Sequence, residues 1–470
     1  MKMQVCLICE GSYPYVAGGV ASWVQMVISA FPDIKFKIWS IATTREEMHE
    51  YKYKLPENVT EVKTLYIGEQ RFEEEQKKLK LNAREVKALK KFMEYDENGW
   101  EDILKLIEKY RTQLPQLLKC EEFCDIVLEN YKKMKNTVCF NDYLWNYRGM
   151  FLPLLSILSE DLIEADIYHT VSTGYAGVLG SVAADIYKKP LIVSEHGIYT
   201  REREEDIIRS KWVQGYFKEL WIRFFKNMSN IAYKKADVVT TLFSTNQTLQ
   251  EELGCPGEKI RLIPNGIDVE ALGSITKDSN KGDFFDIGAI IRIVPIKDVK
   301  TMLVAFSIVK AEIGNARLHI LGNADEDPEY YQECVNLVGE LNVEDVIFYG
   351  QVNIKEYLGK FDVAVLSSIS EGQPLAVLEG MAAGLPFVTT NVGACRELLE
   401  GIGEDTLGRA GYTVPVMDAE TMAERLIYLA KNKELLISMG EAARKRVDCY
   451  YRKEQFLEQY KEMYEKYGEK

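Results

Sequence analysis

The stretch SSISEGQPLAVLEGMAAGLP, residues 367–386, decides the fold of the second half of this 470-residue chain. The apolar run 361–366 leads into it, and its short length and β-branched residues predict a buried strand. A polar loop follows, and Pro374 stands where a helix would begin, at the helical position that needs no N–H donor. We expect the helix to end at Gly384, before Pro386 opens the next strand. A helix N-terminus at the carboxyl edge of a sheet binds anions, because its first amides are free and the helix dipole favours negative charge.

Two carboxylates bracket this predicted anion site. Glu371 lies just before the helix and Glu379 lies inside it. At about 1.5 Å of rise per helical residue they could touch different parts of one elongated ligand. Amides that bind a phosphate, flanked by carboxylates that accept hydrogen bonds from hydroxyls, suit a sugar nucleotide. At this point a strand–helix unit with two solvated surface glutamates remains an open alternative.

The same residues carry a family resemblance. Glu371 and Glu379, within Glu-Gly-Gln-Pro-Leu and Glu-Gly-Met-Ala-Ala-Gly-Leu-Pro, resemble the E-x(7)-E signature of family 4 glycosyltransferases. The resemblance implies an α/β protein of the GT-B class, with two Rossmann-like domains whose parallel sheets face each other across a cleft. By this resemblance Glu371 would contact the hydroxyls of the donor sugar, and Glu379 the ribose. The second-domain residues expected to bind the donor are Gly372, Gln373, Pro374, Leu375 and Glu379.

The composition and charge of the chain limit the classes of protein and of ligand that fit this sequence. With 47% apolar and 28% charged residues, the chain has an ordinary globular composition, and its length suits two or three cores. The net charge of −14 argues against nucleic-acid binding and against unaided binding to an anionic membrane. No apolar run reaches 18 residues, and the N-terminus is better explained as a first strand than as a signal peptide. The nine scattered cysteines indicate reduced thiols and a cytoplasmic protein, with recruitment to the inner face of the membrane by partner proteins left open.

The first strand is expected over residues 3–9 and leads into a loop that contains Gly18 and Gly19. A helix should then run to about Ala30. Paired glycines at a helix start let a backbone approach a ligand closely, because no Cβ intervenes. The loop resembles the glycine-rich loop with which many family 4 transferases face the donor phosphates. By this resemblance Gly19 is the candidate contact to them, with a plain tight turn as the alternative.

Residues 70–150 interrupt the alternation of strands and helices. Between Arg71 and Arg111 there are eleven basic and ten acidic residues, which indicates a solvated face of mixed charge. Apolar residues recur near helical spacing in this part, and they are Phe72, Leu79, Val86, Leu89, Phe92 and Met93. We therefore expect an amphipathic helical insertion that either packs on the first domain as a lid or docks a partner.

A histidine follows one of the predicted strands of the first domain. The strand over 191–194 leads to His196, which is followed by a glycine at the strand's carboxyl end, where ligands of parallel sheets collect. There it could hydrogen-bond a sugar hydroxyl or stabilise developing charge. His169 also lies near a strand end and is a candidate supporting group, whereas His319 is expected to be an ordinary strand residue.

The run SEHGIYTRER, residues 194–203, looks like the signature of PelF-type glycosyltransferases, family 4 enzymes of Pel exopolysaccharide synthesis. The stretches YPYVAGGVASW (13–23) and HTVSTGYAG (169–177) are similar to that family too. With the second half, the resemblance covers nearly the whole chain except the mixed-charge insertion.

Two cations open the second domain. A predicted strand over 284–291 ends at Arg292, and Lys297 follows five residues later at a helix start. A guanidinium fork and a point charge placed in this way can converge on a diphosphate, although a pair of surface cations would also fit. In the resembled family the corresponding residues neutralise the leaving nucleoside diphosphate. Ile291 stands where that family usually has glycine, and it is expected to tighten the approach.

Neither a metal nor a cofactor is predicted. Asp325 and Asp327 form an Asp-x-Asp, but they precede a proline-led helix and are better explained as acids at a helix start. The UDP-sugar would serve as co-substrate. The expected domains are 1–268 (with the insertion), a linker at 269–283, a donor-binding domain at 284–447 and a C-terminal helix at 448–470 that crosses back to the first domain.

These patterns and the resemblance together predict a retaining hexosyltransferase. It would move a hexose from a UDP-sugar, either UDP-glucose or a UDP-N-acetylhexosamine, to a growing Pel-like polysaccharide. The expected catalytic residues are Arg292, Lys297, Glu371 and His196. Expected partners are the UDP-sugar, a glycan acceptor and a membrane-embedded synthesis complex. A sugar-nucleotide epimerase of the same fold and a non-catalytic UDP-sugar-binding or scaffold subunit remain alternatives.

Overall fold

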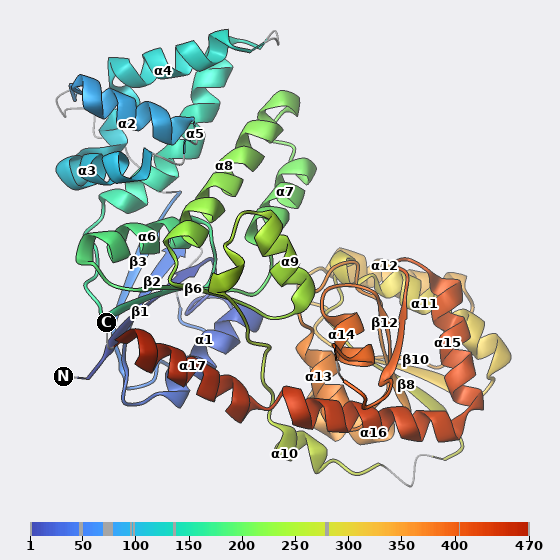
Figure 1. Cartoon of the computed structure of the whole chain (residues 1–470). Helices are drawn as coiled ribbons and strands as arrows, with labels where there is room; N and C mark the ends of the chain where they lie inside the picture. Colours follow the sequence, from blue (N-terminus) through green and yellow to red (C-terminus); the bar gives the residue numbers. More distant parts are fainter. Residues whose placement is uncertain are drawn as a thin grey trace. The chain divides into compact units, whose positions relative to one another are not determined.

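The structure is a computed structural model, and it describes residues 2–46, 50–68, 79–94, 96, 99–134, 138–277, 282–403 and 405–468. The chain forms two compact units. Each unit is built on its own sheet with helices packed against it (Figure 1). Phe72, which the sequence places on the apolar face of the insertion, lies outside the described residues.

The first unit contains a seven-stranded sheet in the order β3-β2-β1-β4-β5-β6-β7. Its strands are β1 (Gln4–Glu10), β2 (Lys35–Ala42), β3 (Val59–Tyr66), β4 (Ile167–Thr170), β5 (Leu191–Glu195), β6 (Val238–Thr241) and β7 (Ile260–Leu262). Neighbouring strands from β3 through to β6 run parallel. The helices that connect them are α1 (Gly19–Ala30), α6 (Tyr175–Tyr187), α7 (Tyr199–Arg209), α8 (Gly215–Lys235) and α9 (Ser244–Glu252). Strands β4, β5 and β6 are buried along their full length, which explains why apolar and β-branched residues predominate in them.

The insertion lies between β3 and β4 and is helical, as the sequence predicts. It consists of α2 (Ala83–Met93), α3 (Trp100–Tyr110), the 3₁₀ segment η2 (Arg111–Lys119), α4 (Glu121–Lys132) and α5 (Phe140–Ser159). Helix α2 starts with a capping box, in which Asn82 and Glu85 each accept a hydrogen bond from the other's backbone amide. Its buried face, which includes Leu89, Phe92 and Met93, belongs to the same core cluster as residues of the sheet. The insertion is therefore packed on its own domain.

The second unit contains a six-stranded parallel sheet in the order β10-β9-β8-β11-β12-β13. Its strands are β8 (Phe285–Ile290), β9 (Ala316–Leu321), β10 (Val346–Gly350), β11 (Val363–Leu366), β12 (Phe387–Thr390) and β13 (Gly411–Val414). Its helices are α10 (Val269–Gly273), α11 (Val299–Glu312), α12 (Pro328–Glu340), α13 (Leu375–Ala382), α14 (Cys395–Glu400), α15 (Ala419–Lys431) and α16 (Lys433–Tyr450). Both sheets are thus Rossmann-like, as the sequence predicts.

The chain passes from one unit to the other more than once. The second unit takes residues 242–246 as well as 262–460, so it begins before the stretch 269–283 that the sequence marks as a linker. That stretch includes α10, which contacts α13 and α16. The last helix, α17 (Lys453–Gly468), starts in the second unit, and residues 461–470 belong to the first.

A buried ion pair anchors α16 inside the second unit. The guanidinium of Arg446 donates to both carboxylate oxygens of Asp405, at 2.7 and 3.2 Å, and both side chains are at most 3% exposed. Further donors of Arg446 bind the carbonyl oxygens of Leu398 (3.2 Å), Leu399 (3.0 Å) and Gly408 (2.5 Å). Because every side of the guanidinium has an acceptor, the buried charge is compensated.

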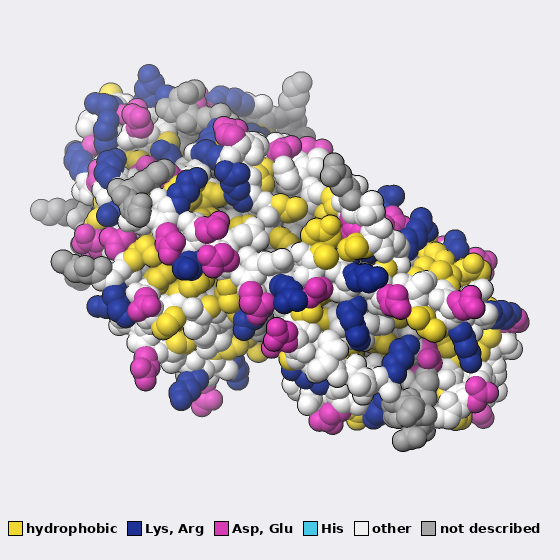
Figure 2. Space-filling view, turned by 60° about the horizontal axis from the view of Figure 1, so that its bottom comes forward, with side chains coloured by type: hydrophobic (Ala, Val, Ile, Leu, Met, Phe, Trp, Pro, Cys, Tyr) yellow, Lys and Arg dark blue, Asp and Glu magenta, His cyan; other side chains and the backbone are white. Residues whose placement is uncertain are grey.

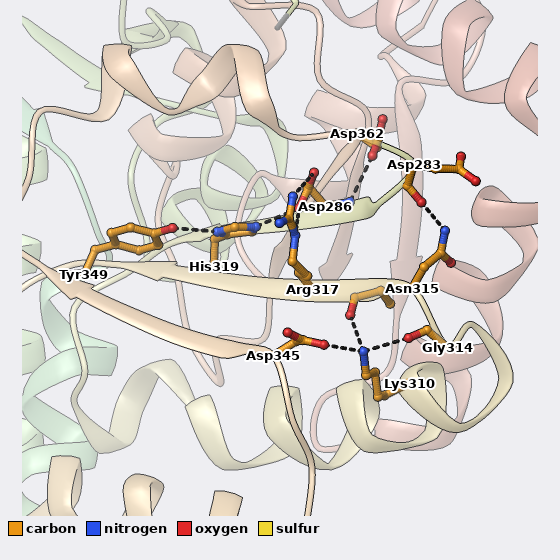
Figure 3. A network of polar contacts seen from close by, with 11 residues as sticks. Asp283, Asp286, Lys310, Gly314, Asn315, Arg317, His319, Asp345, Tyr349 and Asp362 are labelled. Atoms are coloured by element: carbon orange, nitrogen blue, oxygen red, sulfur yellow. Dashed lines mark hydrogen bonds and ion pairs between the residues drawn. The ribbon is translucent and has the colours of Figure 1, made fainter. Parts of the chain in front are cut away.

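His319 takes part in a second polar network, drawn in Figure 3. Its Nε2 lies 2.8 Å from Oδ1 of Asp286 on β8, and its Nδ1 lies 3.0 Å from the hydroxyl of Tyr349 on β10. Arg317 pairs with both oxygens of the same buried aspartate, at 2.7 and 3.1 Å. His319 therefore ties three strands together, which agrees with its expected role as a strand residue.

The surface carries charges of both signs. On the face shown in Figure 2, Lys and Arg side chains are interspersed with Asp and Glu. Among the described residues, no helix is both long enough and apolar enough to cross a membrane.

Candidate functional site

The decisive stretch forms the strand, loop and helix that its sequence predicts. Strand β11 ends at Leu366, and α13 begins at Leu375. Pro374 has extended backbone angles (φ −72°, ψ 111°) and is the N-cap, one position earlier than expected. Gly384, with φ of +81°, follows the helix end in the left-handed region, as expected for a residue after a C-cap. Val377 N makes the first hydrogen bond of the helix, to Pro374 O (3.1 Å). The amides of Leu375 and Ala376 come before it and therefore have no acceptor within the helix.

Lys297 and Glu371 form the central contact of this region. Nζ of Lys297 lies 2.5 Å from Oε1 of Glu371, and their side chains are only 16% and 10% exposed. The hydroxyl of Ser368 donates to the same carboxylate oxygen at 2.5 Å. Ser367 donates to the carbonyl of Lys297 at 2.9 Å, which joins the loop to the 3₁₀ turn η4 (Pro295–Lys297). The structure thus brings together two residues that the sequence places in separate motifs.

Arg292 does not share this contact. It is 56% exposed, and its Nη1 lies 2.6 and 2.7 Å from the two carboxylate oxygens of Glu326. Each of the two predicted diphosphate-binding cations therefore has a carboxylate partner of its own. Sequence reasoning missed Glu326 because nothing in its local pattern distinguishes it from its acidic neighbours.

The neighbours of Arg292 and Glu326 in the chain include two residues that the sequence singles out, Ile291 and Asp327. Ile291 is buried in the core, and its carbonyl lies against Gly322, where an added Cβ would come within 1.8 Å of the oxygen. Its side chain is thus part of the core, and the expected tightening of the ligand's approach to the two cations stays a prediction. Asp327 caps α12 by accepting from Tyr330 N at 3.0 Å, ahead of Pro328 at the helix start. The interpretation of the Asp-x-Asp as helix-start acids is confirmed for this residue.

Glu379, unlike Glu371, has no side-chain partner among the residues that the structure describes. It lies inside α13, partly buried, and within the described residues its carboxylate makes neither an ion pair nor a hydrogen bond. Burial raises its pKa, and the charge of Lys355 opposes that shift. A partly buried carboxylate with free acceptor capacity can receive hydroxyl hydrogen bonds from a ligand.

The residues between the two glutamates have mainly backbone groups to offer a ligand. The side chain of Gln373 is buried, and its Oε1 accepts a hydrogen bond from Asn265 N at 2.7 Å, so this side chain holds the turn at 264–268. The carbonyl of Gly372 accepts from Ala394 N at 2.9 Å. Gly393 has a φ of +52°, and an added Cβ at this residue would lie 2.1 Å from the carbonyl oxygen of Gly372. Sequence reasoning overlooked Gly393, although its positive φ and this close approach both require glycine.

In the first unit, His196 directly follows β5 and packs against α1. Its ring lies 4.8 Å from the ring of Trp23 in an edge-on arrangement. Its Nε2 is shielded from solvent and has no hydrogen-bond partner among the described residues. Burial lowers the pKa of His196 to about 4, so the imidazole is neutral at pH 7 and can donate or accept one hydrogen bond.

Gly19 begins α1, four residues before Trp23 and therefore on the same side of the helix. A Cβ at Gly18 or Gly19 would meet no atom within 4 Å, and the φ of 172° at Gly18 is ordinary extended backbone. Neither glycine is therefore required by the protein's own packing. The open space beside Gly19 is compatible with the close ligand approach that the sequence predicts.

A buried carboxylate supports the His196 loop. Glu195 accepts hydrogen bonds from the hydroxyls of Thr173 (3.2 Å) and Tyr233 (2.6 Å), from Tyr199 N (3.0 Å) and from Gln250 Nε2 (2.9 Å). Burial raises its pKa, and these hydrogen bonds oppose the shift. The loop that carries His196 is thereby fixed to the loop before α6 and to α7, α8 and α9.

His169 has a structural position. It is fully buried, with Nδ1 2.7 Å from the hydroxyl of Tyr464 on α17 and Nε2 2.8 Å from the hydroxyl of Ser194 on β5. Burial, with a smaller contribution from His196, lowers its pKa to about 3. His169 therefore attaches the end of α17 to the sheet. Across the described part of the chain, no group of three or more His, Cys, Asp or Glu side chains is arranged to hold a metal ion.

Comparison with known proteins separates the two halves of the chain. Residues 3–258, more than half of the 470, match the family described as domain of unknown function DUF3492. The chain belongs to the DUF3492 family. Residues 285–432 match a second family model, glycosyl transferases group 1, so the DUF3492 part precedes a glycosyltransferase group 1 domain.

Individual relatives of this DUF3492 protein include a synthase and a glycosyltransferase by name. It is 30% identical to N-acetyl-alpha-D-glucosaminyl L-malate synthase of Bacillus anthracis over 51% of this chain and 62% of that enzyme. It is 25% identical to the amylovoran biosynthesis glycosyltransferase AmsK of Erwinia amylovora over 64% of this chain and 70% of AmsK. The match thus spans less than two thirds of the first of these relatives.

Solved structures show the fold of the DUF3492 protein. Anabaena Alr3699/HepE in complex with UDP matches with a TM-score of 0.62 at 14% identity, over 99% of this chain and 100% of that one. Sucrose-phosphate synthase from Thermosynechococcus elongatus matches with a TM-score of 0.60 at 16% identity, over 99% and 98%. Together with the two parallel sheets, these structural neighbours establish the GT-B fold class.

Proposed function

We propose that this protein is a retaining glycosyltransferase that moves a hexose from a UDP-sugar to a growing polysaccharide. The donor would be UDP-glucose or a UDP-N-acetylhexosamine, and the product a Pel-like exopolysaccharide. The glycosyltransferase group 1 match over residues 285–432 supports the activity, and the neighbour solved with UDP supports the nucleotide. The contact between Lys297 and Glu371, beside the first amides of α13, is the observation that carries the proposal.

The proposed chemistry places negative charge where the second unit offers positive charge. When the bond between the sugar and the diphosphate breaks, its electrons remain on the diphosphate oxygen. Lys297, Arg292 and the amides of Gly372, Gln373 and Leu375 would stabilise that charge more in the transition state than in the ground state. The acceptor oxygen would bond to the same face of the sugar, and its proton would pass to the departing phosphate.

Both cations must exchange partners for this to occur. In the structure Lys297 is paired with Glu371, and Arg292 with Glu326. A bound diphosphate would take over the two cations, because its multiple charged oxygens make stronger charge-assisted bonds than a single carboxylate. Released from Lys297, the free acceptor sites of Glu371 would bind hydroxyls of the donor sugar.

The remaining site residues have supporting roles in the proposal. Glu379 would accept from the ribose hydroxyls, for which its unpartnered carboxylate is suited. His196, neutral and with an unpaired Nε2, would hydrogen-bond a hydroxyl of the transferred sugar. Gly19 would let the α1 backbone approach the donor phosphates. The enzyme would need neither a resident cofactor nor a metal, since cations of the chain would meet the diphosphate charge.

A UDP-release assay on a panel of UDP-sugars tests the proposal. The full-length protein is incubated with each sugar nucleotide, with and without an oligosaccharide acceptor and in the presence of EDTA. We expect UDP release that depends on the acceptor, and a product whose anomeric configuration, read by NMR, matches that of the donor. Conversion of the UDP-sugar to an isomer without an acceptor would indicate an epimerase. Absence of UDP binding in calorimetry would leave only a scaffold role in an exopolysaccharide complex.

A further inference from the structure

Helix α8 presents polar side chains on a face that looks toward the insertion. Arg223, Asn227, Asn230 and Lys234 follow one another at intervals of three or four residues, which aligns them along one side of the helix. The buried residues of α8, such as Phe224, lie around the rest of the helix. A face directed at a neighbouring element is normally apolar. Arg223 and Lys234 at the ends of this stripe are exposed, whereas Asn227 and Asn230 between them are partly buried polar residues.

This stripe forms one wall of a cavity of about 630 Å³ in the first unit. The opposite wall comes from α2 and α3 and includes Phe92 and Trp100. Figure 1 shows α2 and α3 at the upper left and α8 to their right. Nε1 of Trp100 donates to Asp185 at 2.6 Å, which fixes the indole ring in the wall. Cavities of this volume are typical of small-molecule sites.

The charge of the lining is opposite to that of the protein. The whole chain has a net charge of −14, whereas the cavity is lined by six basic and three acidic residues. The basic residues are Arg84, Lys105, Arg223, Lys226, Lys234 and Lys235, and the acidic ones are Asp96, Glu101 and Asp102. Three of these cations are paired with carboxylates, namely Arg84 with Asp102, Lys226 with Glu204 and Lys235 with Asp185, so the excess of positive charge is smaller than the lining residues alone suggest. A concave surface with such an excess concentrates ligands of the opposite charge. The occupant should therefore be an anion.

Neutral hydrogen-bonding groups in the lining narrow the class of anion. The side-chain amides of Asn227 and Asn230 are partly buried and make no hydrogen bond within the described residues. They can donate to phosphate oxygens or exchange hydrogen bonds with hydroxyls. On the opposite wall, Trp100 and Phe92 offer an apolar surface for the face of a base or a sugar ring.

We propose that this cavity binds a phosphate-bearing small molecule, either a nucleotide or a sugar phosphate. The phosphate would lie against Arg223 and Lys234, its neighbouring polar groups against Asn227 and Asn230, and the ring against Trp100. The site lies wholly in the DUF3492 half of the chain and uses none of the donor-binding residues proposed above. The proposed site can therefore be tested independently of the glycosyltransferase reaction.

Calorimetry on the full-length protein tests the site with three probes: inorganic phosphate, glucose 1-phosphate and AMP. We expect one of the two organic phosphates to bind more tightly than inorganic phosphate, and the tighter one identifies the ligand class. Asn230→Asp, which is nearly isosteric but places a negative charge in the cavity, should weaken that binding at least about tenfold. Asn141→Asp, on the exposed start of α5, introduces the same charge outside the cavity and should leave the affinity unchanged.

A second pair of variants separates the cavity from overall charge. Arg223→Ala with Lys234→Ala removes two exposed cations from the lining, and Lys87→Ala with Lys132→Ala removes two exposed cations from elsewhere on α2 and α4. Only the first pair should weaken binding, again by about tenfold or more, while the proteins of both pairs should still unfold cooperatively on heating. Failure of the wild-type protein to bind either organic phosphate would overturn the proposal. So would equal weakening by both pairs.

Discussion

Nζ of Lys297 lies 2.5 Å from Oε1 of Glu371, across 74 residues of sequence. The lysine belongs to the turn before α11 and the glutamate to the loop before α13, so the contact joins the two elements that follow β8 and β11. These strands are neighbours in the sheet, which places both elements at one carboxyl edge. Since Ser368 occupies the same oxygen, Oε2 of Glu371 keeps its acceptor capacity for a ligand.

Replacing Lys297 tests its proposed part in the reaction. Lys297→Ala should lower kcat/KM by about 2–4 kcal/mol of transition-state stabilisation, because one preorganised cation is lost from the developing charge. Lys300→Ala is the matched control, since Lys300 is exposed and pairs with Glu333 at 2.6 Å. Steady-state UDP release measures both variants. Near-native turnover of Lys297→Ala would remove this lysine from the mechanism.

Glu379→Gln should affect binding of the donor more than its turnover. The variant keeps the shape of the side chain but loses the charged acceptor, so KM for the UDP-sugar should rise about tenfold while kcat changes little. Glu420→Gln, at an exposed position on α15, is the control. A drop in kcat at unchanged KM would instead place Glu379 near the reacting bond.

Gly19→Ala separates ligand approach from folding. Because no protein atom lies within 4 Å of the added Cβ, the melting temperature should stay at the wild-type value. If the donor phosphates approach this backbone, KM for the UDP-sugar should rise severalfold. Thermal unfolding and donor saturation curves measure the two effects separately. An unchanged KM would show that the glycine pair is an ordinary helix start.

Asp405→Ala should be among the most destabilising single substitutions in the second unit. It leaves the guanidinium of Arg446 buried without its counter-charge, which costs about 3–5 kcal/mol in free energy of unfolding. Hydrogen bonding to Arg446 lowers the pKa of Asp405 below its unfolded value. The pair's contribution is therefore present above the unfolded pKa and is lost as the pH falls through the lowered one. Urea unfolding at neutral and acidic pH measures it, and a loss below about 1 kcal/mol would contradict the prediction.

His196→Asn should make the protein less sensitive to acid. In the folded protein the pKa of His196 is about 4, below the value of about 6.5 in the unfolded chain. Between these values the unfolded chain binds the extra proton, so wild-type stability falls as the pH falls, by at most about 1.4 kcal/mol per pH unit from this residue. The His196→Asn variant lacks this pH-dependent contribution to the free energy of unfolding. Parallel stability curves for the two proteins between pH 6.5 and 4 would exclude the lowered pKa.

Local patterns in the sequence predicted the elements of the site well. The apolar run before residue 367, the proline and the Gly384 stop correspond to β11 and α13 within one or two residues, because burial and backbone limits act locally. Contacts between distant residues could not be predicted in this way. The pairing of Arg292 with Glu326 depends on which exposed side chains meet, and the use of Gln373 to hold Asn265 depends on where two loops converge.

The bond between Gln373 and Asn265 limits how the protein can be divided. A fragment that starts at β8, where the second sheet begins, would lack Asn265, and it would also lack Ser244, whose amide donates to Glu397 at 3.0 Å. Both residues belong to the second unit but precede its sheet in the chain. Expression of residues 284–447 alone would therefore yield a fragment of the second unit that lacks these two contacts. Biochemical work on the isolated halves would need complementing fragments or a rearranged chain order.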